Sequence, residues 1–193
     1  MQKIKSALCL AVLMAFSSAC AAQSEDAEAQ VDEVVVVDAS AAPKPCQEPE
    51  FRQLDFWIGE WDLTWQQQDG TEGNGTNIIT QEPYGDCVIM ENFDGSPSMP
   101  FKGMSVSTYS KLAKEWRQTW VDDQGGYFSL HGGPQEDGTF ILEMDRYDEK
   151  IPFLRMKWED ISEDSLVWRW QGKADADAEW ADRWVINYRR KGS

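Results

Sequence analysis

The sequence contains few of the side chains on which several common functions depend. Its 193 residues include one histidine, and 18 lysines and arginines stand against 34 aspartates and glutamates, a formal net charge of −16. A single histidine cannot build a histidine-rich metal site and leaves one residue for histidine-based catalysis. So acidic a surface repels phosphates, and binding of nucleic acid or of an anionic membrane through basic patches is therefore not expected.

Motifs of covalent, nucleotide and metal chemistry are also missing. The chain has no G-x-S-x-G nucleophile motif, no glycine-rich phosphate loop followed by lysine, and no C-x-x-C pair. Asp175, Asp177 and Glu179 are spaced like the start of a calcium loop, but Trp180 occupies the required glycine position. We assign no catalytic residue and expect neither a metal nor a cofactor.

The first twenty residues have the features of an export signal. Two lysines precede an apolar run over residues 7–16 that is too short to span a bilayer, and small residues lead into Cys20. This segment resembles a bacterial lipoprotein signal, in which that cysteine is lipidated, although Ser17 stands where leucine is usual. Ordinary cleavage after one of the two following alanines stays open. We expect a periplasmic or outer-membrane protein of a bacterium, whose contact with the membrane is limited to the possible lipid.

Residues 21–45 differ in composition from the rest of the chain. They contain six acidic residues among alanine, serine, glutamine and proline, and no aromatic residue. Such a segment cannot bury enough apolar surface to offset its ordering entropy. We predict a disordered acidic tether here and a single domain over residues 46–193.

Two cysteines remain for the predicted domain. Cys9 lies in the predicted signal and Cys20 is the lipidation candidate, which leaves Cys46 and Cys87. In an exported protein two leftover cysteines most simply form a disulfide, and two buried free thiols are the alternative.

From residue 54 onward, apolar and polar residues alternate in short segments bounded by turn residues. The predicted turns include Asp69-Gly70, Asn74-Gly75, and Gly132-Gly133-Pro134 together with Asp137-Gly138. About ten closely spaced strands without an internal repeat predict an all-β fold, a single antiparallel up-and-down β-barrel. The predicted strands are 61–66, 76–82, 87–93, 104–109, 116–122, 127–131, 139–145, 153–159, 166–171 and 183–190.

The ten tryptophans follow the same alternation. Residues an even number apart share one face of a strand. Four segments each place their indoles on one face: Trp57, Trp61 and Trp65; Trp116 and Trp120; Trp168 and Trp170; Trp180 and Trp184. These faces are most easily placed inside the barrel, where the rings either fill the core or line a ligand cavity.

The chain opens its first strand with Phe-Trp-Ile-Gly-Glu-Trp-Asp at residues 56–62. This resembles the G-x-W start of calycin barrels, which include lipocalins, fatty-acid-binding proteins and nitrobindins. The resemblance implies that Gly59 and Trp61 begin the barrel and that a basic residue of the last strand, Arg189 or Arg190, packs over Trp61. A group of exported bacterial proteins shares similar segments: the same opening, a segment like residues 85–87 and a segment like residues 118–122. The resemblance to this group implies no established reaction.

Nitrobindins hold haem through a proximal histidine, and His131 is the single candidate for that role. It stands at a predicted strand end beside two glycines, where an exposed or hydrogen-bonded residue is equally expected. The haem alternative therefore depends on whether His131 faces the barrel interior.

The best candidate site lies on the predicted strand 116–122. Trp116, Gln118, Trp120 and Asp122 share one face, which combines flat apolar rings with an amide and a carboxylate. We add further lining candidates from later strands: Trp168, Trp170 and Trp184.

These residues lead to a main functional prediction and two alternatives. We predict non-covalent binding of a small, partly apolar ligand in a tryptophan-lined interior. The first alternative is an enzyme, an isomerase or hydrolase with Asp122 as base, which requires a raised pKa of that carboxyl. The second is a structural envelope module whose barrel is completely filled.

Overall fold

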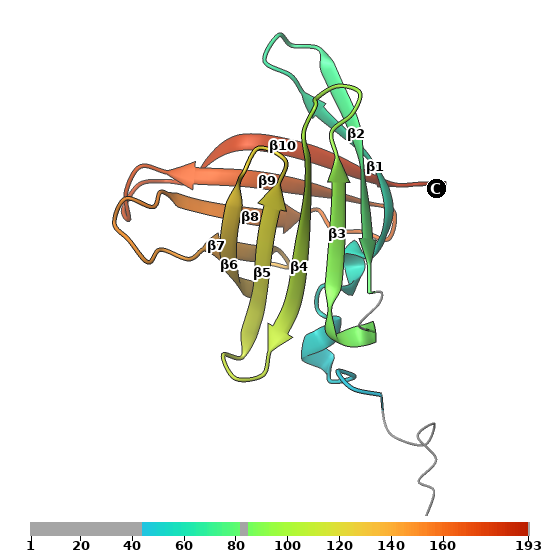
Figure 1. The fold of residues 1–193 in the computed structure, drawn as a ribbon, viewed down its shortest axis with the longest axis vertical. Helices are drawn as coiled ribbons and strands as arrows, with labels where there is room; N and C mark the ends of the chain where they lie inside the picture. Colours follow the sequence, from blue (N-terminus) through green and yellow to red (C-terminus); the bar gives the residue numbers. More distant parts are fainter. Residues whose placement is uncertain (1–43, 82–84, 193) are drawn as a thin grey trace, which may run out of the picture. The chain divides into compact units, whose positions relative to one another are not determined.

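The computed structural model describes residues 44–81 and 85–192, and this part of the chain folds as ten strands with three short 3-10 helices (Figure 1). The predicted signal, Cys20 and almost all of the predicted tether lie outside the described residues. The strands are β1 (Gly59–Gln66), β2 (Glu72–Thr80), β3 (Ile89–Asp94), β4 (Lys102–Ser110), β5 (Glu115–Asp122), β6 (Tyr127–Pro134), β7 (Phe140–Met144), β8 (Phe153–Glu159), β9 (Ser165–Lys173) and β10 (Ala181–Arg190). The 3-10 helices are η2 (Pro49–Arg52), η3 (Asp55–Trp57) and η4 (Gly85–Cys87).

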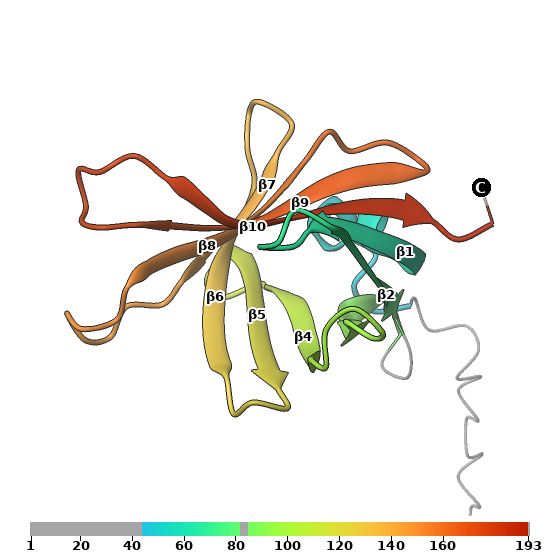
Figure 2. The ribbon, with the colours of Figure 1, turned by 90° about the horizontal axis from the view of Figure 1, so that it is seen from above.

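Each strand pairs antiparallel with its neighbours in the sequence, and β10 pairs with β1 to close the barrel (Figure 2). The prediction of an all-β, up-and-down barrel of about ten strands is confirmed. Because the sheet closes on itself, the described strands leave no unpaired edge.

Two predicted turns lie inside strands. Asn74-Gly75 belongs to β2, where Gly73 and Gly75 face the interior beside Trp65. A Cβ atom on Gly73 would lie 2.4 Å from the Trp65 indole nitrogen, so this glycine provides space for a ring rather than a turn. The turn between β1 and β2 is made at Asp69-Gly70, as predicted.

The Gly132-Gly133-Pro134 turn was also predicted wrongly. These residues continue β6 and pair with β7, with Pro134 opposite Phe140. The chain reverses later, at the predicted Asp137-Gly138, where the Gln135 N–H donates to the Thr139 carbonyl and the Gly138 N–H to the Gln135 carbonyl. Proline is tolerated in β6 because it is the last residue of that strand.

The predicted disulfide between Cys46 and Cys87 is present, with the two Cα atoms 5.0 Å apart. Cys87 lies in η4 and not in a strand. The strand predicted over 87–93 therefore begins two residues later than predicted, at Ile89. The bridge fixes the start of the domain to the entrance of β3.

One end of the barrel is covered by the segment that contains η2 and η3. The Trp57 ring lies 5.3 Å from the Trp158 ring, and the Trp116 indole donates to Gln53 Oε1 at 3.1 Å. We call this the closed end and define it by Trp57, Trp116, Phe140 and Trp158, each about 1% exposed or less. Aromatic rings fill it almost completely.

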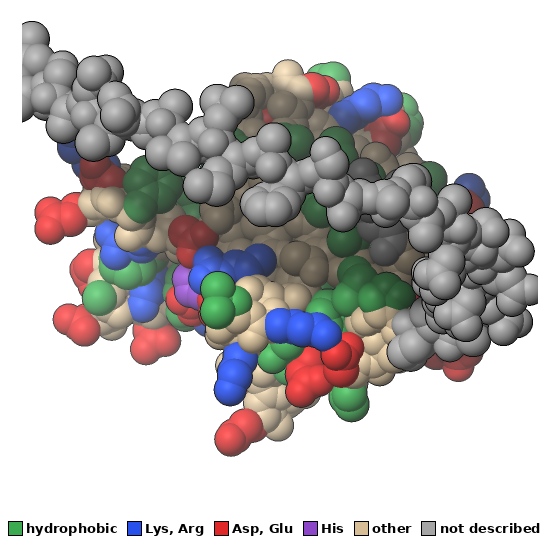
Figure 3. All heavy atoms as spheres, turned by 60° about the horizontal axis from the view of Figure 1, so that its bottom comes forward, with side chains coloured by type: hydrophobic (Ala, Val, Ile, Leu, Met, Phe, Trp, Pro, Cys, Tyr) green, Lys and Arg blue, Asp and Glu red, His purple; other side chains and the backbone are tan. Residues whose placement is uncertain are grey.

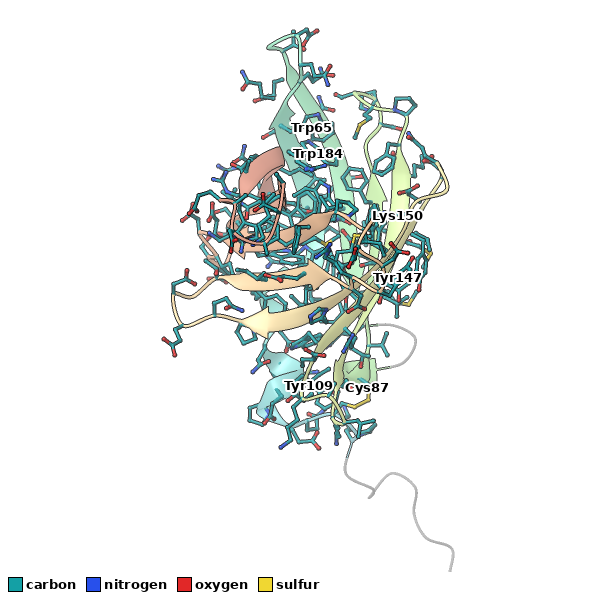
Figure 4. All side chains as sticks on the ribbon, turned by 90° about the vertical axis from the view of Figure 1, so that its left-hand side faces the viewer. Trp65, Cys87, Tyr109, Tyr147, Lys150 and Trp184 are labelled. Atoms are coloured by element: carbon teal, nitrogen blue, oxygen red, sulfur yellow. A yellow bond between two sulfur atoms is a disulfide. The ribbon has the colours of Figure 1, made fainter. Side chains whose placement is uncertain are left out.

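The opposite end, which we call the open end, carries Trp65 and Trp184. Figure 4 shows these two residues far from Tyr109 and Cys87, which mark the closed end. Trp184 is only partly buried, and its ring lies 5.5 Å from that of Trp65. No 3-10 helix described in the structure covers this end.

Arg190 performs the closing role that the G-x-W resemblance implied. Its guanidinium lies 4.2 Å from the centre of the Trp61 ring and donates to the carbonyl of Ile58 at 2.8 Å. Arg189, the other candidate, is exposed on the outer face opposite Asp62. Gly59 adopts φ +141, and a Cβ atom there would lie 2.2 Å from the guanidinium.

The tryptophan alternation holds for β1, β5 and β9 but fails for Trp180. A bulge between Asp182 and Trp184 inserts one extra residue into β10, which moves Trp180 to the outer face. There its ring lies under the guanidinium of Arg155 at 4.2 Å and the ammonium of Lys173 at 4.9 Å. Trp57 belongs to η3 and therefore does not follow strand alternation.

The outer face of the barrel carries charged residues of both signs, and Figure 3 shows acidic and basic side chains interspersed on one side of the molecule. Arg169, for example, contacts both Glu159 and Asp182. In the described ranges no helix is long and apolar enough to cross a membrane.

Candidate functional site

A cavity of about 220 Å³ lies inside the barrel toward the open end. It is smaller than typical drug-sized pockets of roughly 300–1,000 Å³, so it suits a compound of one or two rings. Its aromatic wall consists of Phe93, Phe101, Trp120, Phe128, Trp168, Trp170 and Trp184. The remaining lining residues are Glu91, Asp122, Met156, Ile186 and Tyr188.

Trp168 and Trp170 form a stacked pair in this wall. They lie two residues apart on β9, their planes differ by only 4°, and their ring centres are 6.4 Å apart. Trp184 stands perpendicular to Trp168 at 6.0 Å, and Phe128 lies 5.4 Å from Trp170. All four rings are partly exposed, so their faces are available to a ligand.

Five of the seven predicted ligand-binding residues line the cavity: Trp120, Asp122, Trp168, Trp170 and Trp184. The other two share the inward face of β5 but lie farther along it. Trp116 belongs to the closed end, and Gln118 is buried where its amide donates to Ser107 Oγ at 2.9 Å. Alternation predicted the face of these two residues correctly and their position along the barrel axis wrongly.

Asp122 stands at the end of β5, at the mouth of the cavity. Its Oδ2 accepts from the Trp120 indole at 3.0 Å, and its Oδ1 accepts from the backbone N–H groups of Gly126 and Gln124. Burial acts to raise the pKa of Asp122, but these hydrogen bonds outweigh it and hold the pKa below its ordinary value. The raised pKa that a base at this position requires is therefore absent.

Glu91 is the functional residue that sequence reasoning missed. It lies on the inward face of β3 between Ile89 and Phe93, is 5% exposed, and lines the cavity. Its Oε1 accepts from the Asn77 amide at 2.7 Å and its Oε2 from Ser105 Oγ at 2.6 Å. The sequence contained a signal for it. Glu91 is two residues from both Ile89 and Phe93, so it occupies an inward position where the alternation of the strand requires an apolar residue.

Burial raises the pKa of Glu91 to about 7, against the lowering effect of the hydrogen bonds from Ser105 and Asn77. Tyr188, on β10, shares the Asn77 amide through its hydroxyl oxygen at 3.0 Å. Burial and the neighbouring Glu91 raise the pKa of Tyr188 above its ordinary value. The cavity wall therefore contains one carboxyl group that changes charge near neutral pH, and a neutral phenol beside it.

His131 lies on the outer face of the barrel. Its neighbour Leu130 is fully buried, whereas the His131 Nδ1 atom lies 2.7 Å from an Asp145 oxygen that also contacts Arg117. The haem alternative requires a histidine inside the barrel, and His131, the one histidine of the sequence, lies outside it. In the described ranges no group of three or more His, Cys, Asp or Glu side chains is placed to hold a metal ion.

Comparison with known proteins assigns no family. No protein-family model matches the chain, and no curated protein matches it. The closed barrel and its cavity therefore carry the functional argument.

Proposed function

We propose that this protein binds a small, partly apolar ligand non-covalently in the aromatic cavity of a calycin-like barrel. The observation that supports this most is the cavity itself, about 220 Å³ of space lined by eight aromatic rings including that of Tyr188, beside a closed end in which such rings are packed to near-complete burial. A module with a purely structural role is expected to have a filled barrel, without a cavity beside partly exposed indoles.

The calycin-like assignment rests on two features. The first is the closed antiparallel topology, and the second is the stacking of Arg190 on Trp61 at the start of the barrel. Both are what the G-x-W resemblance implied, and barrels of this kind with about eight to ten strands are wide enough to hold one small ligand.

Export belongs to the same proposal. The Cys46–Cys87 disulfide fits an oxidising compartment. Together with the lipoprotein-like signal it favours a periplasmic or outer-membrane protein, with Cys20 as the lipidated residue. The partner proposed is the small molecule alone, with contact to a membrane only through that lipid.

Binding can be tested by titrating the full chain with indole in a calorimeter. Trp168→Ala removes one wall of the cavity, and we expect it to weaken indole binding roughly threefold to tenfold. Trp180→Ala is the matched control, because it removes an indole from the outer face of the same region. Equal affinities in the two variants, or no saturable binding to the wild type, would contradict the proposal.

A second candidate function, acid–base catalysis in the same cavity, is favoured by Glu91 rather than by Asp122. A carboxyl group with a pKa of about 7 inside an aromatic cavity has the property that a general acid or base needs at neutral pH. Loss of turnover in Glu91→Gln with retained ligand affinity would separate catalysis from binding alone.

A further inference from the structure

The charged groups that line the cavity are all acidic. Glu91 and Asp122 are the only ionisable lining residues apart from the neutral phenol of Tyr188, and no lysine, arginine or histidine faces the cavity in the described structure. The whole chain adds a net charge of −16. An anionic ligand would meet two carboxylates without a compensating cation, so the fatty-acid type of ligand is disfavoured here.

The hydrogen bonds around Glu91 favour its ionised form. The side chains of Asn77 and Ser105 both donate into the carboxylate, one to each oxygen. A carboxylate offers about four acceptor positions, so each oxygen keeps one for a ligand donor. Donors aimed at both oxygens stabilise the ionised carboxylate, and a cation in the cavity would balance its negative charge.

The aromatic wall fits the same kind of ligand. The stacked rings of Trp168 and Trp170 add apolar surface to the wall, and indole faces attract a nearby positive charge. Asp122 stays ionised at the mouth, because hydrogen bonds hold its pKa below the ordinary value. Asp122 thus places a negative charge in the cavity lining, whereas the nearby guanidinium of Arg183 lies over Gly172 and outside that lining.

We propose that the ligand is an organic amine, a one- or two-ring apolar body carrying a protonated amino group that hydrogen-bonds to Glu91. This inference rests on the proposed binding function and narrows it to a chemical class. The ring system would lie against the walls of β9 and β10, and the ammonium group would reach the carboxylate on β3.

The proton on Glu91 gives the binding a defined pH dependence. Without ligand, Glu91 holds a proton on about half of the molecules near pH 7, and an ammonium group must displace that proton to water. Affinity for an amine should therefore rise between pH 6 and 8. The titratable groups facing Glu91 do not change charge in this range, because the pKa of Tyr188 is raised and that of Asp122 is lowered.

The experiment compares three probes that share an indole body: tryptamine as the cation, 3-ethylindole as the neutral analogue, and indole-3-acetate as the anion. Each is titrated into the full wild-type chain at pH 6, 7 and 8 by calorimetry. We expect tryptamine to bind at least about tenfold tighter than 3-ethylindole at pH 8, with indole-3-acetate weakest. The preference for tryptamine should shrink at pH 6.

Glu91→Gln keeps the shape of the side chain and removes its charge. We expect it to weaken tryptamine binding at least about tenfold and to leave 3-ethylindole nearly unchanged. Glu136→Gln, an exposed residue in the turn after β6, is the control for the change in net charge. If Glu91→Gln does not fold, the three probes on the wild type still decide the question.

The outcomes separate the two proposals. If no probe binds, ligand binding in the cavity is itself wrong. If the three probes bind with similar affinity, or if the neutral or anionic probe binds tightest, the cavity binds ligands but the amine inference is overturned. Tighter tryptamine binding that survives unchanged in Glu91→Gln would equally overturn it, because the cation would then be held elsewhere.

Discussion

The two ends of the barrel use the same residue types for different purposes. At the closed end Trp57, Trp116 and Trp158 are almost completely buried: Trp57 packs against Trp158, and Trp116 and Trp158 both pack against Phe140. At the open end Trp168 and Trp184 are only partly buried and surround a cavity. Trp116 and Trp158 lie on inward faces of strands, as Trp168 and Trp184 do, so inward orientation alone does not decide whether an indole becomes core or cavity wall.

The difference between the ends comes from the segment before β1. η2 and η3 place Phe51, Leu54 and Trp57 over the closed end, which supplies the extra layer of apolar atoms that fills it. At the open end the loop between β3 and β4 contributes Met99 and Phe101, and Phe101 becomes part of the cavity wall instead of filling the space. A short segment outside the sheet thus determines where the cavity lies.

The largest expected effect tests this comparison directly. Trp158→Ala at the closed end should lower the free energy of unfolding by about 3–5 kcal/mol, because a fully buried indole is replaced by a void. Trp168→Ala should cost only about 1 kcal/mol, since its ring already borders open space. Guanidinium denaturation measures both, and equal losses would show that the two ends do not differ as described.

The disulfide sharpens the comparison, because it lies at the closed end. The bridge joins cysteines 41 residues apart, and the double variant Cys46→Ser, Cys87→Ser should lose about 3–4 kcal/mol of stability. Indole affinity at the open end should change by less than about twofold, because distant sites act independently. A parallel loss of affinity would mean that the two ends are coupled.

Glu91 stands between the two regions and should make stability depend on pH. Its pKa of about 7 in the folded protein lies above the ordinary value of 4.5, so the folded state holds this proton more tightly than the unfolded chain does. The contribution to stability is complete below about pH 4.5 and is lost as the pH rises through 7, a change of about 3 kcal/mol.

Chemical denaturation from pH 5 to 8 measures this effect. Glu91→Gln should flatten the decline that the wild type shows over this range, whereas Glu136→Gln should keep it. An unchanged decline in Glu91→Gln would assign the titration to another group.

The smallest effect concerns the closure of the barrel. Gly59→Ala should destabilise the protein by about 2 kcal/mol, because Gly59 has φ +141 and a Cβ atom would collide with the Arg190 guanidinium. Gly70→Ala, at φ +83 in a turn with free space around it, should cost only about 1 kcal/mol. Similar losses in thermal unfolding would indicate that the stacking of Arg190 on Trp61 contributes little.

The sequence was sufficient to predict most of the fold, because short alternating segments and a pair of leftover cysteines leave few alternatives. Alternation also predicted correctly that Trp120, Asp122 and the indoles of β9 face the cavity. Alternation could not exclude Trp116 and Gln118 from the cavity. It specifies which face of a strand a residue is on, but not how far along the barrel axis the interior is filled.

Glu91 was missed for an energetic reason. An acidic residue in a strand is normally assigned to the solvent face, because burial of an unpaired charge is costly. Here Asn77 and Ser105, from the neighbouring strands, supply the compensating hydrogen bonds. Their contribution depends on strand register, which the pattern of a single strand does not contain.

The bulge in β10 has a consequence for how this barrel can change. By inserting one residue, it shifts the phase of the strand, so the segment before Asp182 no longer shares its inward positions with the segment that follows. Trp184 therefore belongs to the cavity wall, whereas Trp180, just before the strand, faces outward against Arg155 and Lys173. A substitution at Trp180 would change the outer surface without changing a residue that lines the cavity.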